Sequence, residues 1–279
     1  MDDEEFRRWV ALLEERTGVV VPQERKQFLE TNLRLRMREV GADDFEAYHR
    51  DLLSGRRGAV EWAVLVDRLT VHQTHFFRHR PSLEMVADEV LPDFVVRTGG
   101  KAAFHAWSVG CSTGEEAYSL AMVIDRYAAK ADAPFHYGVT ASDVSQPALV
   151  VGRSGRYPNS KLSEIPPEYR ELYCVTGRTD SFVMHERLLK RVGFAMLNLL
   201  DVARQPLSHL DLIYCQNVLI YFPRERRLGV LDQLVKCLRP GGHLILGPGE
   251  MTGWRHPLLT RVAGQRTLAY RRRAEEPKQ

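Results

Sequence analysis

The sequence lacks several features that would place it in a specialised class of protein. It has only four cysteines, and none of them forms a C-x-x-C pair. This spacing disfavours a disulfide framework or a zinc knuckle, so we expect a reducing, cytoplasmic setting. It has no run of about 18 apolar residues, which excludes a transmembrane span of the usual kind. The start, MDDEEFRRWV, is acidic and does not resemble a signal peptide.

An excess of charge of one sign is also missing. The 39 Lys and Arg residues nearly balance the 36 Asp and Glu residues, which leaves a formal charge of +3. This charge is too small to indicate a nucleic-acid partner by itself. The chain is 44% hydrophobic and 27% charged, as is typical of a globular protein, and its 279 residues suit one large domain or two small ones.

The spacing of apolar residues changes along the chain. Up to about residue 80 they recur at helical spacing, with Gly41 as a helix stop and Gly55 and Gly58 as breaks. From about residue 101, short apolar runs that suit strands alternate with helical segments, which predicts an α/β fold with a mainly parallel, doubly wound sheet. We therefore expect three regions: an N-terminal helical domain at 1–80, a linker helix at 81–100, and an α/β domain at 101–279.

One segment interrupts the alternation, at about residues 157–194. It contains three prolines and the turn-like sequence TGRTDS (176–181), which is flanked by the β-forming stretches YCV and FVMH. This pattern predicts a small antiparallel β-subdomain inserted into the α/β domain. The alternative is an irregular surface excursion.

Polar residues follow four predicted strands, at the edge where open α/β sheets bind ligands. In the first loop, VGCSTGEE, Gly110 and Gly114 allow tight bends, and Glu115 and Glu116 open a helix. The loop is neither a P-loop nor G-x-G-x-x-G, which disfavours an NAD-binding oxidoreductase. Its two carboxylates suit a positively charged ligand without phosphates, although acids at this position also balance the helix dipole.

The later strand ends extend this interpretation. Asp143 closes one strand, where an acid can accept hydrogen bonds from both ribose hydroxyls. Asn198 follows another, and Gln216 and Asn217 end a third, with Tyr221 just beyond. Together these residues describe an adenosine pocket with room for a positive charge. S-adenosylmethionine fits, because it combines adenosine with a sulfonium and has no phosphates.

At this point the sequence resembles the CheR family of S-adenosylmethionine-dependent chemotaxis receptor methyltransferases. The shared motifs, in order, are L-T-x-x-x-T-x-F-F-R (69–78), STGEEAYS (112–119), ASD (141–143), NLL (198–200) and C-x-N-V-L-I-Y-F (215–222). The resemblance covers nearly the whole chain. It implies a class I methyltransferase fold and methyl transfer to glutamate side chains of receptor cytoplasmic helices, which tunes chemosensory adaptation. The product would be S-adenosylhomocysteine.

The resemblance also implies roles for individual residues. It places Arg78 and Tyr221 at the reacting centre. His72 departs from the family by replacing an asparagine, Gln216 replaces a frequent arginine, and LGPGE keeps only Glu250 of the usual L-x-G-H-S-E ending. The positions that match cofactor contacts are His72, Thr74, Arg78, Glu116, Asp143, Asn198, Leu199, Gln216 and Asn217.

The stretch TVHQTHFFRHR (70–80) also raises the question of a metal. His72, His75 and His79 would share one face of a helix, a spacing at which histidines can ligate a metal. No acid nearby completes such a site, and the resembled family needs no metal. We therefore expect no metal, with Thr74 and Arg78 as the important residues of the stretch.

A glutamate acceptor needs little chemical activation. Its unperturbed pKa of about 4.3 makes it an anion near neutral pH, so no catalytic base is required. Holding oxygen, methyl carbon and sulfur in line supplies much of the rate. Arg78 could orient the carboxylate by a bidentate contact. The alternative is a structural ion pair.

The sequence also suggests how a receptor would dock. The helix after Pro22 carries Arg34, Arg36 and Arg38, which suit an acidic receptor helix bundle, although such a face is often merely solvated. Some members of the resembled family use such a β-subdomain to bind a C-terminal receptor peptide, and they have a longer glycine-containing loop there. The TGRTDS turn is short and keeps only Gly177, so the resemblance implies no such peptide binding here. We expect no nucleic acid, no membrane insertion and a monomer. The rival functions are methylation of a different acceptor and a non-catalytic receptor-binding module.

Overall fold

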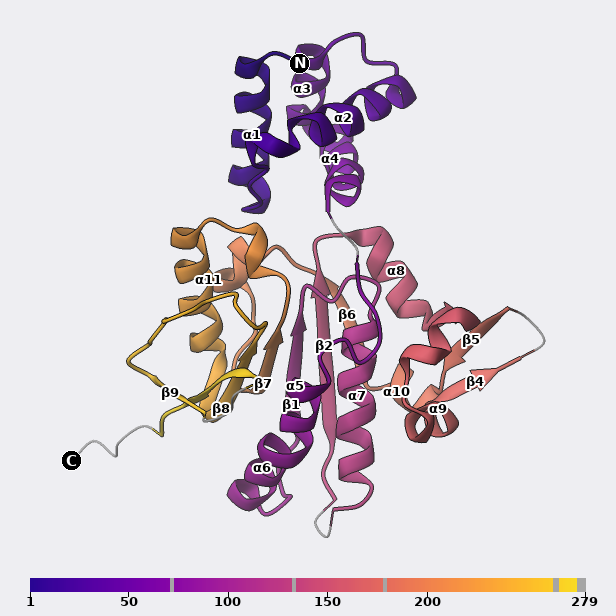
Figure 1. Cartoon of the computed structure of the whole chain (residues 1–279), viewed down its shortest axis with the longest axis vertical. Coiled ribbons are helices and arrows are strands. Elements are labelled where there is room, and N and C mark those ends of the chain that lie inside the picture. The colour runs from indigo at the N-terminus through magenta and orange to yellow at the C-terminus, as the bar shows by residue number, and fades with distance from the viewer. Residues whose placement is uncertain (71–72, 132–133, 178–179, 263–265, 275–279) are drawn as a thin grey trace.

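The computed structural model describes residues 1–70, 73–131, 134–177, 180–262 and 266–274. A helical N-terminal part stands above an α/β domain, and a smaller sheet projects from one side of that domain (Figure 1). In these described ranges, no helix has both the length and the apolar character needed to cross a membrane.

Four helices build the N-terminal part, as the sequence predicted. They are α1 (Asp3–Thr17), α2 (Lys26–Val40), α3 (Phe45–Leu53) and α4 (Gly55–Leu69), with a short 3-10 turn, η1 (Gln23–Arg25), before α2. Asp2 and Glu5 form a capping box at the start of α1, and Gly41 ends α2 with a φ of 74°. The apolar faces of the four helices meet in a separate core around Trp9, Leu29 and Tyr48.

Gly55 lies at the break between α3 and α4, with a φ of 55°, but Gly58 does not break the chain as expected. Helix α4 begins at Gly55 and contains Gly58, so only Ser54 separates it from α3. A Cβ atom on Gly58 would lie 2.5 Å from the carbonyl oxygen of Asp51. Gly58 therefore permits a close approach of α4 to the end of α3, which a breaker signal does not reveal.

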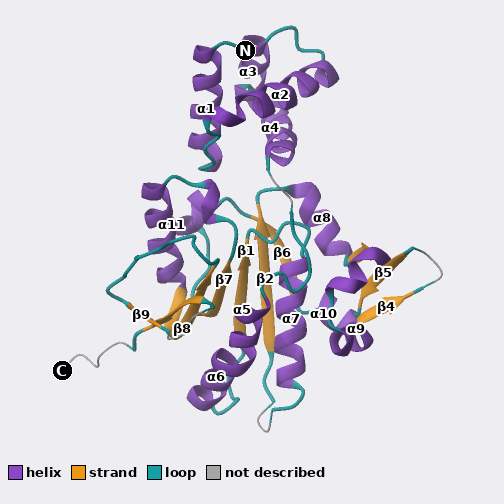
Figure 2. Ribbon diagram, viewed as in Figure 1, coloured by secondary structure: helices purple, strands orange, loops and turns teal. Residues whose placement is uncertain are grey.

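The α/β domain contains a seven-stranded sheet in the order β6-β2-β1-β7-β8-β10-β9. Its parallel strands are β1 (Phe104–Val109), β2 (Tyr137–Asp143), β6 (Val192–Met196), β7 (Leu210–Cys215) and β8 (Leu238–Leu246). Helices α7 (Glu115–Ala128) and α8 (Gln146–Ser154) lie on one face, and α11 (Arg224–Cys237) lies on the other (Figure 2). This is the predicted doubly wound fold, with its switch point between β1 and β7.

Residues 80–98 are helical and belong to the core beside the sheet. They form α5 (Arg80–Met85), the π-helical turn η2 (Val86–Val90) and α6 (Leu91–Thr98). Val86, Leu91 and Phe94 are fully buried in the same cluster as Phe104 of β1. This stretch is therefore integrated with the α/β domain by packing.

Two strands at the C-terminal end were not anticipated. β9 (Leu259–Arg261) and β10 (Leu268–Arg272) pair antiparallel with each other, and β10 also pairs antiparallel with β8. Their sequences are short and rich in arginine. Burial is concentrated at Leu259, Ala269 and Tyr270, so little apolar alternation marks them as strands.

The inserted unit is a small antiparallel sheet, as predicted, and not an irregular excursion. It has the order β3-β5-β4, with β3 (Arg156–Pro158), β4 (Cys174–Thr176) and β5 (Ser181–Met184). The helical turns η3 (Asn159–Glu164), α9 (Pro167–Tyr173) and α10 (Glu186–Leu189) accompany it. Two residues of its TGRTDS turn, 178 and 179, lie outside the described residues.

Candidate functional site

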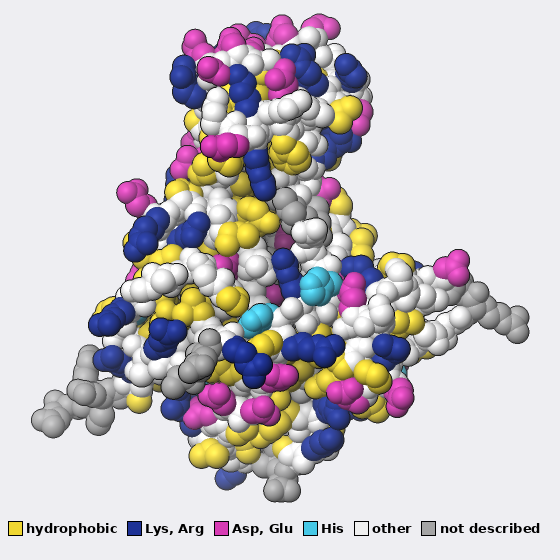
Figure 3. Space-filling model, viewed as in Figure 1, with side chains coloured by type: hydrophobic (Ala, Val, Ile, Leu, Met, Phe, Trp, Pro, Cys, Tyr) yellow, Lys and Arg dark blue, Asp and Glu magenta, His cyan; other side chains and the backbone are white. Residues whose placement is uncertain are grey.

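A cavity of about 190 Å³ lies at the C-terminal ends of β1, β2 and β7. The N-terminal helical part forms its roof through residues 17–28, and Figure 3 shows the surface hollowed where the two parts meet. The position is the switch point of the sheet, where open α/β folds bind their ligands. The candidate residues that line the cavity are Thr74, Arg78, Glu116, Asp143, Asn198, Leu199, Gln216, Asn217 and Tyr221.

The loop after β1 is bent tightly and held by Asp143. Gly110 and Ser112 both have left-handed backbones, with φ of 67° and 49°. A Cβ atom on Gly110 would lie 2.4 Å from a methyl carbon of Val218, so glycine is required there. The Asp143 carboxylate accepts hydrogen bonds from the backbone amides of Ser112 at 2.8 Å and Ser145 at 2.9 Å. Asp143 thus ties the first loop to the end of β2.

Glu115 and Glu116 are adjacent in sequence but lie in different environments. Glu115 is fully buried, pairs with Lys161, and accepts a hydrogen bond from the Thr113 hydroxyl at 2.6 Å. Glu116 faces the cavity and accepts a hydrogen bond from the Ser108 hydroxyl at 2.7 Å. Only Glu116 is therefore placed to meet a ligand.

Burial raises the pKa of Glu116 to about 8. The hydrogen bond from Ser108 opposes this rise, the nearby Glu250 adds to it, and Arg78 weakly opposes it. At neutral pH the carboxyl is therefore mostly protonated. A cation placed beside it would favour the ionised form, which makes Glu116 a receptive partner for positive charge.

Glu250 organises the loop after β7, a role that the sequence did not reveal. Its buried carboxylate accepts hydrogen bonds from the backbone amides of Val218 at 2.8 Å, Leu219 at 2.9 Å and Gly247 at 2.7 Å. This support fixes the turn at Asn217, whose φ is 60°. The sequence hinted at this role only by keeping Glu250 in the LGPGE ending, which otherwise departs from the family motif.

Gln216 and Asn198 are engaged by the protein itself. The Gln216 side-chain amide donates to the Ser82 hydroxyl at 2.7 Å, which joins the end of β7 to α5. The Asn198 oxygen accepts from the backbone amide of Leu200 at 3.0 Å, and its nitrogen donates to the Arg16 carbonyl at 2.5 Å. Asn198 therefore caps η4 (Leu199–Arg204) and ties the cavity wall to the end of α1.

A backbone hydrogen bond also attaches the N-terminal helical part to the cavity wall. The amide of Val20 donates to the carbonyl oxygen of Tyr221 at 3.1 Å. Tyr221 ends the short 3-10 turn η5 (Leu219–Tyr221) and lies on the cavity wall. The N-terminal part thus closes the cavity over one of the two residues assigned to the reacting centre.

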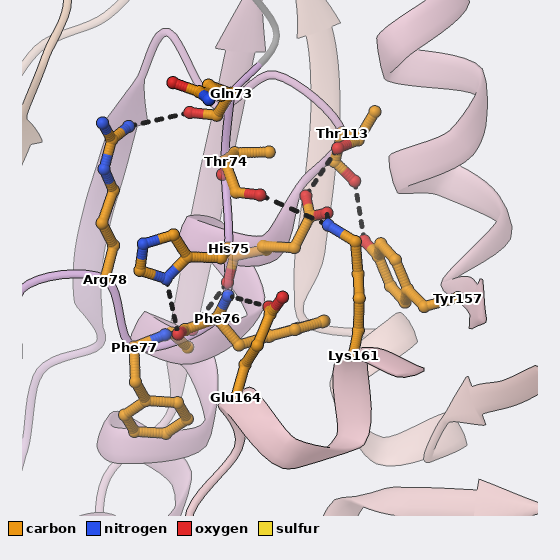
Figure 4. Close-up of polar contacts among 12 residues, drawn as sticks. Gln73, Thr74, His75, Phe76, Phe77, Arg78, Thr113, Tyr157, Lys161 and Glu164 are labelled. Atoms are coloured by element: carbon orange, nitrogen blue, oxygen red, sulfur yellow. Dashed lines mark hydrogen bonds and ion pairs between the residues drawn. The ribbon is translucent and has the colours of Figure 1, made fainter. Parts of the chain in front are cut away.

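The segment 73–78 runs along the cavity without forming a helix (Figure 4). Arg78 is exposed, and its Nη1 donates to the carbonyl oxygen of Gln73 at 2.8 Å. Among the residues that the structure describes, Arg78 forms no ion pair, so the structural ion-pair alternative has no partner there. Phe76 and Phe77 are buried against Tyr157 and Tyr169 of the inserted unit.

The histidines of this stretch have separate surroundings. His72 lies outside the described residues. His75 Nδ1 is 3.3 Å from the carbonyl oxygen of Phe76, and His79 Nδ1 is 2.7 Å from the Ser82 hydroxyl. In the described part of the chain, no group of three or more His, Cys, Asp or Glu residues could hold a metal ion.

Arg34, Arg36 and Arg38, the three residues expected to dock the receptor, differ in how far their side chains are exposed and paired within the protein. Arg34 pairs with Glu30 at 2.8 Å and lies over the Phe45 ring, and Arg38 is exposed. Arg36 is half-buried and bridges to Glu61 of α4 at 2.6 Å and to Glu39 at 2.7 Å. Its guanidinium is therefore engaged within the helical part, and Arg34 and Arg38 are the two accessible members.

The donor set of the cavity fits S-adenosylmethionine. Glu116 and Asp143 present carboxyl groups, and most of the remaining lining is apolar or neutral, including Val144 and Leu199. The carboxyl groups of Glu116 and Asp143 would disfavour a negatively charged ligand with phosphates. A nucleoside with a positive charge would meet a receptive carboxyl in Glu116 and an acid suited to ribose in Asp143.

Comparison with known proteins agrees with this chemistry. The family described as CheR methyltransferase, SAM binding domain matches residues 72–267, and CheR methyltransferase, all-alpha domain matches residues 4–70. The chemotaxis protein methyltransferase of Escherichia coli K12 is 32% identical over 253 residues, covering 90% of this chain and 85% of that protein. The chemotaxis protein methyltransferase of Borreliella burgdorferi is 27% identical over 249 residues, covering 88% of each.

Proposed function

The chain belongs to the CheR methyltransferase family and is an S-adenosylmethionine-dependent methyltransferase, and on this basis we propose that it methylates glutamate side chains of chemoreceptor cytoplasmic helices. One observation carries the proposal. Arg78 and Tyr221, which suit a carboxylate acceptor, line the same cavity as Glu116 and Asp143, which suit the cofactor.

The cofactor would be held by residues at the strand ends. Bound S-adenosylmethionine supplies an electrophilic methyl group on a sulfonium. Glu116 would attract the ammonium group of its amino-acid part, and Asp143 would accept hydrogen bonds from ribose hydroxyls. Leu199 is buried on the cavity wall and supplies apolar contact. Thr74, Asn198, Gln216 and Asn217 complete the proposed lining.

The acceptor needs orientation and not deprotonation. A glutamate with a pKa of about 4.3 is an anion at neutral pH. Apart from the bond to Gln73, the guanidinium N–H groups of Arg78 have no partner among the described residues, so they can pair with the incoming carboxylate. The Tyr221 hydroxyl, which lines the same cavity, can hold the same group. The two residues together would restrict the carboxylate to an attack geometry.

The direct test is a radiolabelled methyl assay with receptor cytoplasmic fragments. We expect label to enter the fragment and to be released by mild base, because glutamate esters are base-labile. Replacing the labelled glutamates by glutamine should abolish incorporation. Label that resists base would show another acceptor, and receptor binding without any label would show a non-catalytic module.

We propose that Arg34 and Arg38 dock the receptor. Reversing both charges (Arg34→Glu, Arg38→Glu) should raise the receptor KM about 3- to 10-fold at low salt and weaken its salt dependence, because a steering charge is lost. The affinity for S-adenosylhomocysteine should not change. Arg56→Glu with Arg57→Glu is the matched control, since both residues are exposed on α4 and give the same change in net charge. Equal effects of the two pairs would exclude α2 as the docking surface.

We also propose that methylation does not depend on a peptide tail of the receptor. The edge strand β4 has three residues, which offer few backbone groups to an added strand. Deleting the receptor tail should change the methylation rate by less than about twofold, and tail peptides should give no binding heat at micromolar concentrations. Micromolar binding, or a large loss of methylation on deletion, would contradict this proposal.

A further inference from the structure

The segment that carries Arg78 is held in an unfavourable backbone conformation. Phe77 has a φ of 52°, in the left-handed region that residues other than glycine rarely adopt. Such a conformation persists only when the surrounding structure holds it in place. This turn at Phe77 directly precedes Arg78, so whatever holds the turn also sets the direction of the guanidinium.

The inserted β-subdomain supplies two polar contacts to this segment (Figure 4). The Glu164 carboxylate accepts a hydrogen bond from the backbone amide of Phe76 at 2.8 Å. The Lys161 ammonium donates to the carbonyl oxygen of Thr74 at 3.3 Å, and it also pairs with the buried Glu115. Both residues belong to η3 of the inserted unit, about 90 residues away in sequence.

Further contacts fix the two aromatic side chains of the turn. The Phe76 ring lies 5.0 Å from the Tyr157 ring and 6.1 Å from the Phe182 ring, both in the inserted unit. The Phe77 ring lies 4.9 Å from the ring of Tyr169. From the α/β domain itself, the Ser119 hydroxyl accepts a hydrogen bond from the Phe77 amide at 3.0 Å. The inserted unit therefore contacts the turn on its backbone and on both rings.

We infer that Glu164 is a positioning residue for Arg78, and that the inserted β-subdomain acts as a clamp on the segment 73–78. Its carboxylate satisfies the amide next to the strained residue, and Lys161 fixes the segment two residues earlier. Without the acceptor, the turn can relax and Arg78 loses its direction toward the cavity. The inference rests on the proposed role of Arg78 in orienting the acceptor.

The test compares Glu164→Ala with Glu164→Gln in the full chain. Glutamine keeps an oxygen that accepts from the Phe76 amide, whereas alanine does not. We expect Glu164→Ala to lower kcat about tenfold, with the receptor KM and the Kd for S-adenosylhomocysteine changed by less than about twofold. Glu164→Gln should restore kcat. The matched control is Glu168→Ala, which removes an exposed carboxylate of the same unit that lies 3.7 Å from Arg126.

Hydrogen exchange measured by mass spectrometry on a peptide covering residues 73–80 gives a second readout that needs no acceptor. Glu164→Ala should speed amide exchange there about tenfold, and Glu164→Gln and Glu168→Ala should leave it as in the wild type. Unchanged exchange in Glu164→Ala, or an equal loss of kcat in the alanine and glutamine variants, would overturn the inference. A wild-type protein that labels no receptor would contradict the proposed function instead, and exchange would still decide whether Glu164 holds the segment.

Discussion

Replacing Arg78 by alanine should slow methyl transfer to the receptor about 100-fold at saturating cofactor, because the acceptor carboxylate loses the group that orients it. The side chain is exposed and makes one hydrogen bond to the described residues, to the Gln73 carbonyl. Its removal therefore leaves the core intact, and the melting temperature should not change. Single-turnover measurement of label transfer separates this loss from product release.

Arg78→Lys is the informative companion. Lysine keeps the positive charge but not the planar fork that pairs with both carboxylate oxygens. If Arg78 acts by holding both carboxylate oxygens in a fixed orientation, the lysine variant should recover only part of the rate of methyl transfer. Full recovery by lysine would reduce the role of Arg78 to charge, and near-normal turnover of a folded alanine variant would remove Arg78 from the reacting centre.

The fold could be predicted because its signals are local. Helical periodicity before residue 80 and the alternation of strands and helices after residue 101 follow from burying one face of each element. The antiparallel strands β9 and β10 were missed because they bury few side chains and have arginines at other positions. Gly58 was misread because only the three-dimensional packing of α3 against α4 shows why it is glycine.

The strand-end residues could be brought together from sequence, but their individual environments could not. Glu115 and Glu116 are adjacent, yet the first is paired with Lys161 and the second faces the cavity. The partner Lys161 is 46 residues away, in the inserted unit. Asn198 similarly reaches the Arg16 carbonyl across 182 residues of sequence. Such contacts depend on how separate elements pack, which periodicity and motif spacing do not encode.

Glu116→Gln should weaken S-adenosylmethionine binding roughly 10- to 100-fold at pH 8.5, the range expected when a hydrogen bond to a charged group is lost. Burial raises the pKa of Glu116 to about 8, so the free protein carries this proton at neutral pH. A cation beside the carboxyl favours its ionised form. The wild-type affinity should therefore increase with pH up to about 8 and fall again at higher pH, where the amino group of the cofactor loses its proton.

The raised pKa of Glu116 also makes folding stability depend on pH. This dependence is opposite in direction to the rise of cofactor affinity between neutral pH and pH 8. Between the ordinary value of 4.5 and about 8, the folded protein keeps a proton that the unfolded chain has released. The unfolding free energy of the cofactor-free protein therefore falls as pH rises through this window. Glu116→Gln has no such proton. The difference between its melting temperature and that of the wild type should therefore shift in favour of the variant as the pH rises from 5 to 8.

Calorimetry in buffers of different ionisation enthalpy measures the protons released on binding. The amino group of the cofactor also titrates, at a pKa of about 8 for an ordinary α-amino group, so the Glu116→Gln profile supplies the correction for the ligand. After this correction the wild type should release close to one proton per bound cofactor at pH 7, because nearly all of Glu116 starts protonated. Equal proton release by the two proteins would mean that Glu116 keeps its proton in the complex and binds the cofactor as a neutral carboxyl group.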